Sequence, residues 1–129
     1  MKTILIIGLL VLFSSTVFGA DKAEPLLVEK QHFSTENFTT VSGTTLPQVD
    51  IGWESYGELN KAKDNVILIT HYFSGTSHAA GKYSADDAVA GYWDALIGPG
   101  KAIDTNKYFV ISSDTLVNAN WHDPHVITT

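Results

Sequence analysis

The chain has 129 residues, of which 44% are hydrophobic and 17% charged, and its formal net charge is −6. A single domain of this length and composition can bury a core, which excludes a wholly disordered chain. All eight basic residues are lysines, and neither arginine nor cysteine occurs. We therefore expect no nucleic-acid partner, because the chain has no basic stripe. The lack of cysteine excludes a disulfide scaffold, a thiolate zinc site and a cysteine nucleophile.

The first twenty residues have the layout of a secretory signal peptide. A short basic start, Met1-Lys2, is followed by an apolar run over residues 4–13 and by small and polar residues from 14 to 20. The run has no polar face and no alternation, unlike a strand or helix of a folded domain, and it is too short to span a membrane. We predict an exported protein, periplasmic or secreted, with no membrane attachment after cleavage.

Residues 21–30, with Pro25, are expected to form a linker, and residues 31–129 the folded part. Threonines and aromatic residues predict a strand over residues 31–39. Val49, Ile51 and Trp53 alternate with polar residues or glycine, which predicts an antiparallel strand with one buried face. The aliphatic run at residues 66–69 has no polar face and is typical of a parallel strand covered on both sides, and the apolar run at residues 108–111 predicts a second buried strand.

Between these two apolar runs, Ser84 is expected to cap a short helix that ends before the Gly-Pro-Gly at residues 98–100. Val89, Trp93 and Leu96 would share one face of this helix. The order of elements predicts the α/β class, with antiparallel strands that lead into a parallel central sheet.

The segment that most suggests chemistry is His71-Tyr72-Phe73-Ser74-Gly75, directly after the first aliphatic run. Ligands collect at the carboxyl ends of parallel strands, and two free amides there can stabilise an oxyanion during acyl transfer. The alternative is an ordinary strand-ending turn with its histidine hydrogen-bonded in the core. Ser74 lacks the Gly-x-Ser-x-Gly context of a nucleophile elbow, and no such motif occurs in the chain, so we do not expect the nucleophile in this sequence.

Five histidines raise the question of a metal site. The pairs are His71 with His78 and His122 with His125, and Asp123 could serve as a third ligand. Pro124 interrupts the second pair, and no helix is evident there that would bring the two rings to one face. We predict no metal site and no cofactor.

Several segments resemble the N-terminal part of the homoserine O-acetyltransferase family, whose members have the α/β-hydrolase fold. The Tyr-Gly-Glu-Leu-Asn block at residues 56–60 and the Gly-Pro-Gly-Lys-x-Ile-Asp-Thr block at residues 98–105 are specific. The resemblance covers residues 33–116, in order and with family-like spacing. The remaining matching segments are residues 49–55, 65–81, 91–94 and 108–112.

The resemblance implies a serine–aspartate–histidine triad that works through an acyl-serine intermediate, with all three residues beyond Thr129. One catalytic element carries over to this chain. The family's His-Ala-Leu-Ser/Thr-Gly motif contributes an amide to the oxyanion hole, and its leucine position is Phe73. The resemblance therefore assigns this role to the backbone N–H of Phe73. Because the triad lies elsewhere, we expect the 129 residues to be inactive alone.

The sequence also departs from the family around the expected pocket. Tyr72 and Phe73 replace Ala-Leu, Thr76 stands where the family usually has Asp, and Asp114 where it usually has Asn. Residues 117–120, Val-Asn-Ala-Asn, replace a glycine-rich stretch.

Export adds an objection to acetyl transfer, because the family's donor, acetyl-CoA, is cytosolic. The favoured interpretation is a fragment of an exported serine-dependent hydrolase that acts on a small-molecule acyl ester. The alternatives are a homoserine O-acetyltransferase-type acyltransferase and a non-catalytic truncated product or binding module.

Overall fold

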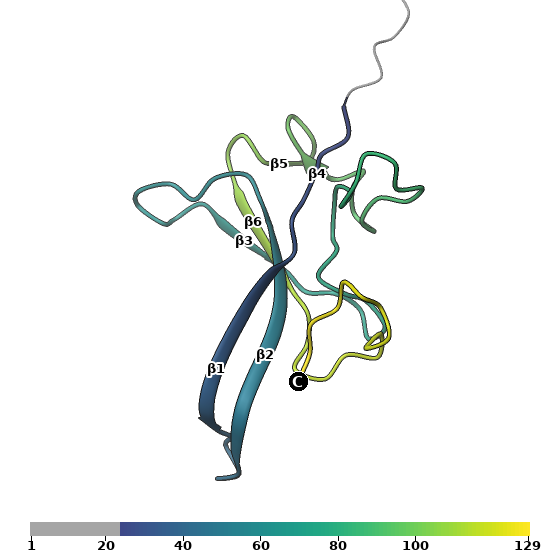
Figure 1. Cartoon of the computed structure of the whole chain (residues 1–129). Coiled ribbons are helices and arrows are strands. Elements are labelled where there is room, and N and C mark those ends of the chain that lie inside the picture. The colour runs from purple at the N-terminus through teal and green to yellow at the C-terminus, as the bar shows by residue number, and fades with distance from the viewer. Residues whose placement is uncertain (1–23) are drawn as a thin grey trace, which may run out of the picture.

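The computed structural model describes residues 24–129, and strands are its regular elements (Figure 1). The predicted signal peptide, residues 1–20, lies outside the described residues. Four strands form one sheet in the order β1-β2-β6-β3, and two short strands pair separately as β4-β5. Their bounds are Gln31–Thr39 for β1, Thr45–Tyr56 for β2, Val66–Ile69 for β3, Ile97–Gly98 for β4, Ile103–Asp104 for β5 and Phe109–Ser113 for β6.

The main sheet is mixed, as the sequence predicts. β1 and β2 form a long antiparallel hairpin in which Gln31 lies opposite Trp53. β6 is antiparallel to β2, and β3 is parallel to β6 with Val66 opposite Phe109. The expectation of antiparallel strands that lead into a parallel pair is confirmed.

The predicted buried face of the alternating strand is wrong after Val49, because Gly52, Glu54 and Tyr56 are buried while Ile51 and Trp53 are half-buried. The core and Lys30 lie against the side of β2 that carries Glu54 and Tyr56.

The covering of β3 differs from the expectation. Val66 and Leu68 are 48% and 61% exposed, whereas Ile69 and, on the neighbouring strand β6, Val110 are buried. In the described part of the chain, β3 is the last strand of the sheet, and the face that carries Val66 and Leu68 is left about half exposed. The prediction that this strand is buried on both faces is therefore wrong for residues 24–129.

The helix predicted after Ser84 is also wrong, because residues 84–96 form a series of turns. The backbone N–H of Gly91 donates to Gly81 O at 2.9 Å, and that of Trp93 donates to Ala79 O at 2.7 Å. These donors are thus used across the loop instead of along a helix. A Cβ at Gly91 would lie 2.3 Å from the backbone N of Ala80, so the close crossing of the two segments requires glycine.

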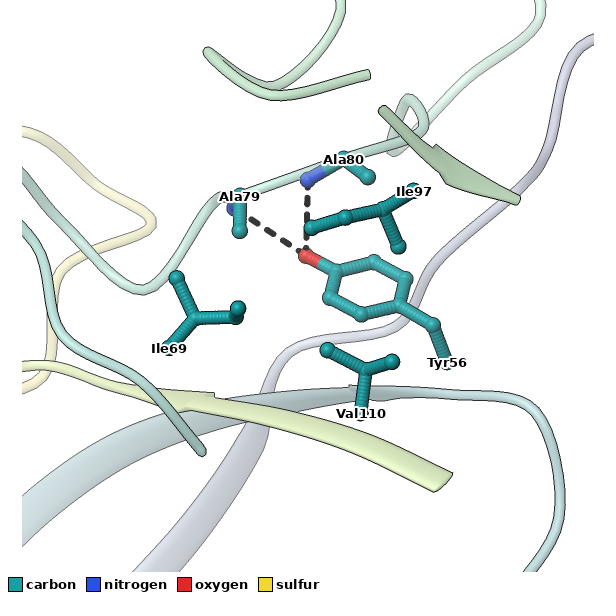
Figure 2. Packing of buried hydrophobic residues seen from close by; sticks show 6 residues of the cluster. All are labelled: Tyr56, Ile69, Ala79, Ala80, Ile97 and Val110. Atoms are coloured by element: carbon teal, nitrogen blue, oxygen red, sulfur yellow. Dashed lines mark hydrogen bonds between the residues drawn. The ribbon is translucent and has the colours of Figure 1, made fainter. Parts of the chain in front are cut away.

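The core lies between the sheet and this loop (Figure 2). The Tyr56 hydroxyl, which projects from the end of β2, accepts hydrogen bonds from the amides of Ala79 and Ala80 at 3.1 and 3.0 Å. Its ring belongs to an apolar cluster of buried residues: Tyr56, Ile69, Ala79, Ala80, Ile97 and Val110. The core therefore fixes the loop that follows β3 to the central strands.

Part of the segment expected to be a linker is attached to the fold. The amide of Val28 donates to Lys82 O at 2.9 Å, and the amide of Lys82 donates to Leu26 O at 2.8 Å. Within residues 24–129 no helix is long and apolar enough to cross a membrane.

Candidate functional site

The segment that follows β3 folds into a tight turn at the carboxyl end of that strand. The amide of Gly75 donates to Tyr72 O at 2.8 Å, and the His71 ring donates from Nδ1 to the same carbonyl at 2.6 Å. A Cβ on Gly75 would lie 2.8 Å from the Cβ of His71, which explains the glycine. Residues 71–75 are called the oxyanion turn below, after the role that the resemblance assigns to Phe73.

Phe73 lies on the surface of the oxyanion turn, where it is 94% exposed. Beside it is an open cavity of about 660 Å³, lined by His71, Phe73, Thr115, Val117, Asn118, Ala119 and Trp121. A smaller cavity of about 120 Å³ adjoins the ends of β3 and β6, where Ile69 and Ser113 are among the lining residues. His71 lines both cavities, and its Nε2 is buried without a hydrogen-bond partner. The cavities thus lie where the sequence places a ligand site, at the carboxyl ends of the parallel strands.

Glu54 of β2 is the centre of a buried polar network beneath the loop that follows the oxyanion turn. Its side chain is fully buried. The Tyr83 hydroxyl donates to Oε1 at 2.6 Å, while the Tyr56 hydroxyl and His78 Nδ1 reach Oε2 at 2.8 and 3.1 Å. The Lys30 ammonium lies 3.2 Å from Oε1. These partners supply the hydrogen bonds and countercharge that a buried carboxylate requires.

The partners of Glu54 also determine its ionisation. Burial alone raises the pKa of Glu54, but the hydrogen bonds from His78 and Tyr83, the charge of Lys30 and the hydrogen bond from Tyr56 outweigh it and lower the pKa to about 2. Burial and the nearby Glu54 carboxylate raise the pKa values of Tyr56 and Tyr83. Both phenols therefore stay protonated and act as hydrogen-bond donors to Glu54.

Asp114 is a second buried carboxylate, directly after β6. Its Oδ1 accepts the amide of Ser77 at 2.7 Å, and its Oδ2 lies 3.3 Å from the Lys30 ammonium, which also bonds the Ser77 hydroxyl. Gly52 makes room for this carboxylate, because a Cβ there would lie 2.3 Å from Asp114 Oδ2. Lys30 is thus shared by Glu54 and Asp114, and it comes from the segment expected to be a linker.

Two asparagines after β6 bind the oxyanion turn itself. Asn118 Nδ2 donates to Gly75 O at 3.1 Å, and Asn120 Nδ2 donates to Ser74 O at 2.7 Å. Asn118 is 3% exposed. Figure 1 shows the C-terminal segment, in yellow, beside the loop that follows β3. Residues 117–120, which differ from the glycine-rich stretch of the family, therefore place side-chain hydrogen-bond donors against the oxyanion turn.

The histidines that the sequence pairs have different partners in the structure. His71 bonds Tyr72 O within the oxyanion turn, whereas His78 contacts Glu54 and stacks on Tyr83 at 4.3 Å between ring centroids. His125 stacks on the other side of Tyr83 at 4.1 Å, and His122 lies against Trp121 at 3.5 Å. Among residues 24–129, no three histidine or carboxylate side chains gather in an arrangement that could hold a metal.

Sequence reasoning missed Glu54, Lys30 and Asn118 as residues that shape the site. Glu54 stood on the polar side of an alternating strand, and Lys30 in a segment without periodicity. A signal was present for Asp114 and Asn118, since both lie at departures from the family pattern. The oxyanion role of Phe73 stays a prediction.

The mixed sheet and the turn at the end of its parallel strand are the features of part of an α/β-hydrolase fold. No family model matches the chain. The chain superimposes on esterase E22 with a TM-score of 0.77 and 63% identity, over 80% of this chain and 28% of E22. It superimposes on homoserine O-acetyltransferase from Bacillus anthracis with a TM-score of 0.77 and 57% identity, over 81% of this chain and 28% of that one.

A homoserine O-succinyltransferase from Pseudomonas syringae pv. tomato is 47% identical over 105 residues, which make up 81% of this chain and 27% of the relative. The chain is therefore a relative of the homoserine O-acyltransferases and of esterase E22. It spans about a quarter of the length of these relatives.

Proposed function

We propose that the chain is the N-terminal part of an exported, serine-dependent acyl-ester hydrolase. The observation that carries this proposal is the 63% identity to esterase E22 over 80% of this chain. The export part rests on the predicted signal peptide at residues 1–20.

In this proposal the chain supplies the electrostatic part of acyl transfer. The attacking serine, its histidine and its acid come from the part of the fold that this segment does not cover. As the ester carbonyl becomes tetrahedral, its oxygen gains negative charge, and the Phe73 N–H donates a hydrogen bond to that oxygen. Collapse of this intermediate breaks the ester C–O bond, and the histidine returns the serine proton to the departing alcohol, which leaves the acyl-serine. Water then attacks the acyl-serine, with its proton passing through the histidine to the serine oxygen, and the acid is released.

The lining of the larger cavity favours ester hydrolysis over transfer from an acyl-CoA. Its large apolar members are Phe73, Val117 and Trp121, and neither a lysine nor a carboxylate is among its lining residues. A nucleotide phosphate or a succinyl carboxylate is normally bound by lysine or arginine, and arginine does not occur in this chain. The likeness to the O-acyltransferases keeps acyl transfer as the second candidate.

The test is a chimera of esterase E22 in which residues 24–129 of this chain, which include Lys30, replace the matching part of E22. We expect the folded chimera to hydrolyse a chromogenic short-chain ester. Phe73→Ala should keep much of the rate, because the amide remains. Phe73→Pro should lower turnover by ~100- to 1000-fold, as expected for a lost oxyanion donor.

Lys61→Pro, in an exposed turn far from the cavity, is the matched control for the proline. Unchanged turnover in a folded Phe73→Pro chimera would show that the amide has no such role. A folded chimera that acylates homoserine from an acyl-CoA but does not hydrolyse esters would support the acyltransferase. A folded chimera with neither activity would support a binding module.

A further inference from the structure

Side chains from the segment after β6 hold the backbone of the oxyanion turn and its continuation at three points. Asn120 donates to Ser74 O at 2.7 Å, Asn118 donates to Gly75 O at 3.1 Å, and Asp114 accepts the amide of Ser77 at 2.7 Å. The first of these contacts is one residue from Phe73. The turn's own Gly75-to-Tyr72 hydrogen bond closes it on the other side of Phe73.

The surroundings of Asn118 determine how its amide is oriented. Its Nδ2 faces the carbonyl of Gly75, which can only accept, and its Oδ1 accepts the amide of Asn120 at 2.8 Å. Its own N–H donates to the Thr128 hydroxyl at 3.1 Å. Asn118 therefore links the turn, Asn120 and the C-terminal segment. Its side-chain NH₂ is needed for the carbonyl of Gly75, and its side-chain oxygen is needed for the amide of Asn120.

We propose that Asn118 is a positioning residue that sets the direction of the Phe73 N–H through the carbonyl of Gly75. The inference rests on the proposed hydrolase function, because the direction of this amide matters only if it meets a developing oxyanion. Pre-oriented donors are effective because they need no reorganisation as the reaction occurs, and small misplacements cost rate steeply. Loss of the Asn118 donor should thus slow the chemical step and leave ground-state binding nearly unchanged.

Asn118→Asp tests this with little change in volume. The variant keeps an acceptor for the Asn120 amide but turns a carboxylate oxygen toward the carbonyl of Gly75. Asn106→Asp, at an exposed position in the turn before β6, adds the same charge away from the cavity and is the matched control. In the E22 chimera we expect Asn118→Asp to lower kcat by about 10- to 100-fold with KM changed less than about twofold. Asn106→Asp should change neither.

Hydrogen–deuterium exchange of residues 71–78 provides a readout that does not need activity. It is measured on the chimera and on the chain itself. Faster exchange in these residues for Asn118→Asp, with the β1–β2 hairpin unchanged, is expected. Unchanged exchange, or a loss of kcat that a general fall in melting temperature accompanies, would overturn the positioning role. If Phe73→Pro leaves turnover intact while Asn118→Asp still speeds exchange in the turn, the result would refute the oxyanion role of the Phe73 N–H. It would still show that Asn118 holds the turn.

Discussion

The exposed edge of β3 leads to a prediction about how the isolated chain associates. Val66 and Leu68 point to the same side of the strand and are 48% and 61% exposed. Their strand carries no charge, proline or bulge, the features that natural edge strands use against pairing. We expect the chain without residues 1–20 to associate through β3 at micromolar concentration.

The size of the effect follows from the area that pairing would cover. Full burial of a leucine side chain is worth about 1.5–3 kcal/mol, so covering the 61% of Leu68 that is exposed contributes roughly 1–2 kcal/mol. Leu68→Lys removes this contribution and places a charge on the edge. The association constant should fall by a factor of roughly 5 to 30.

Sedimentation velocity is the measurement, with Val41→Lys as the matched control. Val41 is fully exposed in the turn between β1 and β2, so this variant has the same change in net charge without any change to β3. Leu68→Lys should reduce association strongly and Val41→Lys should not. If the unmodified chain is a monodisperse monomer with a cooperative thermal transition, the edge does not drive association and the binding-module interpretation gains support.

Two further predictions concern Glu54 and the signal peptide. The pKa of Glu54 is lowered from 4.5 to about 2, so the free energy of unfolding should decrease as the pH falls from about 4.5 to 2, by roughly 3 kcal/mol in all. Urea titrations of the Leu68→Lys chain at several pH values should show this decrease, and an equal decrease in a Glu54→Gln background would contradict it. Residues 1–25, fused to a reporter that is active only outside the cytoplasm, should give signal that Leu9→Arg with Leu12→Arg abolishes. Equal signal from the doubly substituted fusion would mean that the apolar run does not direct export.

The strands could be predicted from the sequence because their patterns reflect contacts within the sheet. The alternation at Val49, Ile51 and Trp53 and the aliphatic run of residues 66–69 both lie in observed strands. The sequence could not exclude the helix predicted after Ser84, because that prediction rests on a capping serine and on apolar spacing, and both are local signals. The hydrogen bonds that Gly91 and Trp93 make to Gly81 and Ala79 bridge segments 10 and 14 residues apart and leave no local pattern.

The sequence predicted the part of the site that lies at the ends of strands. It did not predict the part that consists of buried charged side chains. The position of Phe73 follows from the end of β3, and the cavity is found there. The network behind it combines Lys30, Glu54 and Asp114 from three separate segments. No periodicity connects a lysine before β1 with carboxylates on β2 and after β6.

The presence of an acidic residue at position 114 is accounted for by its ion pair with Lys30. The side chains of Asp114 and Glu54 are both buried around the Lys30 ammonium, and a buried charge without a partner is strongly unfavourable. Lys30 lies 3.2 Å from Glu54 and 3.3 Å from Asp114, so one ammonium compensates both groups. Because Asp114 also accepts the amide of Ser77, the segment before β1 is coupled electrostatically to the loop that continues from the oxyanion turn. The residue at position 114 can therefore differ from the asparagine usual in the family without leaving an uncompensated charge, since the chain supplies its counterion from outside the segments that carry the resemblance.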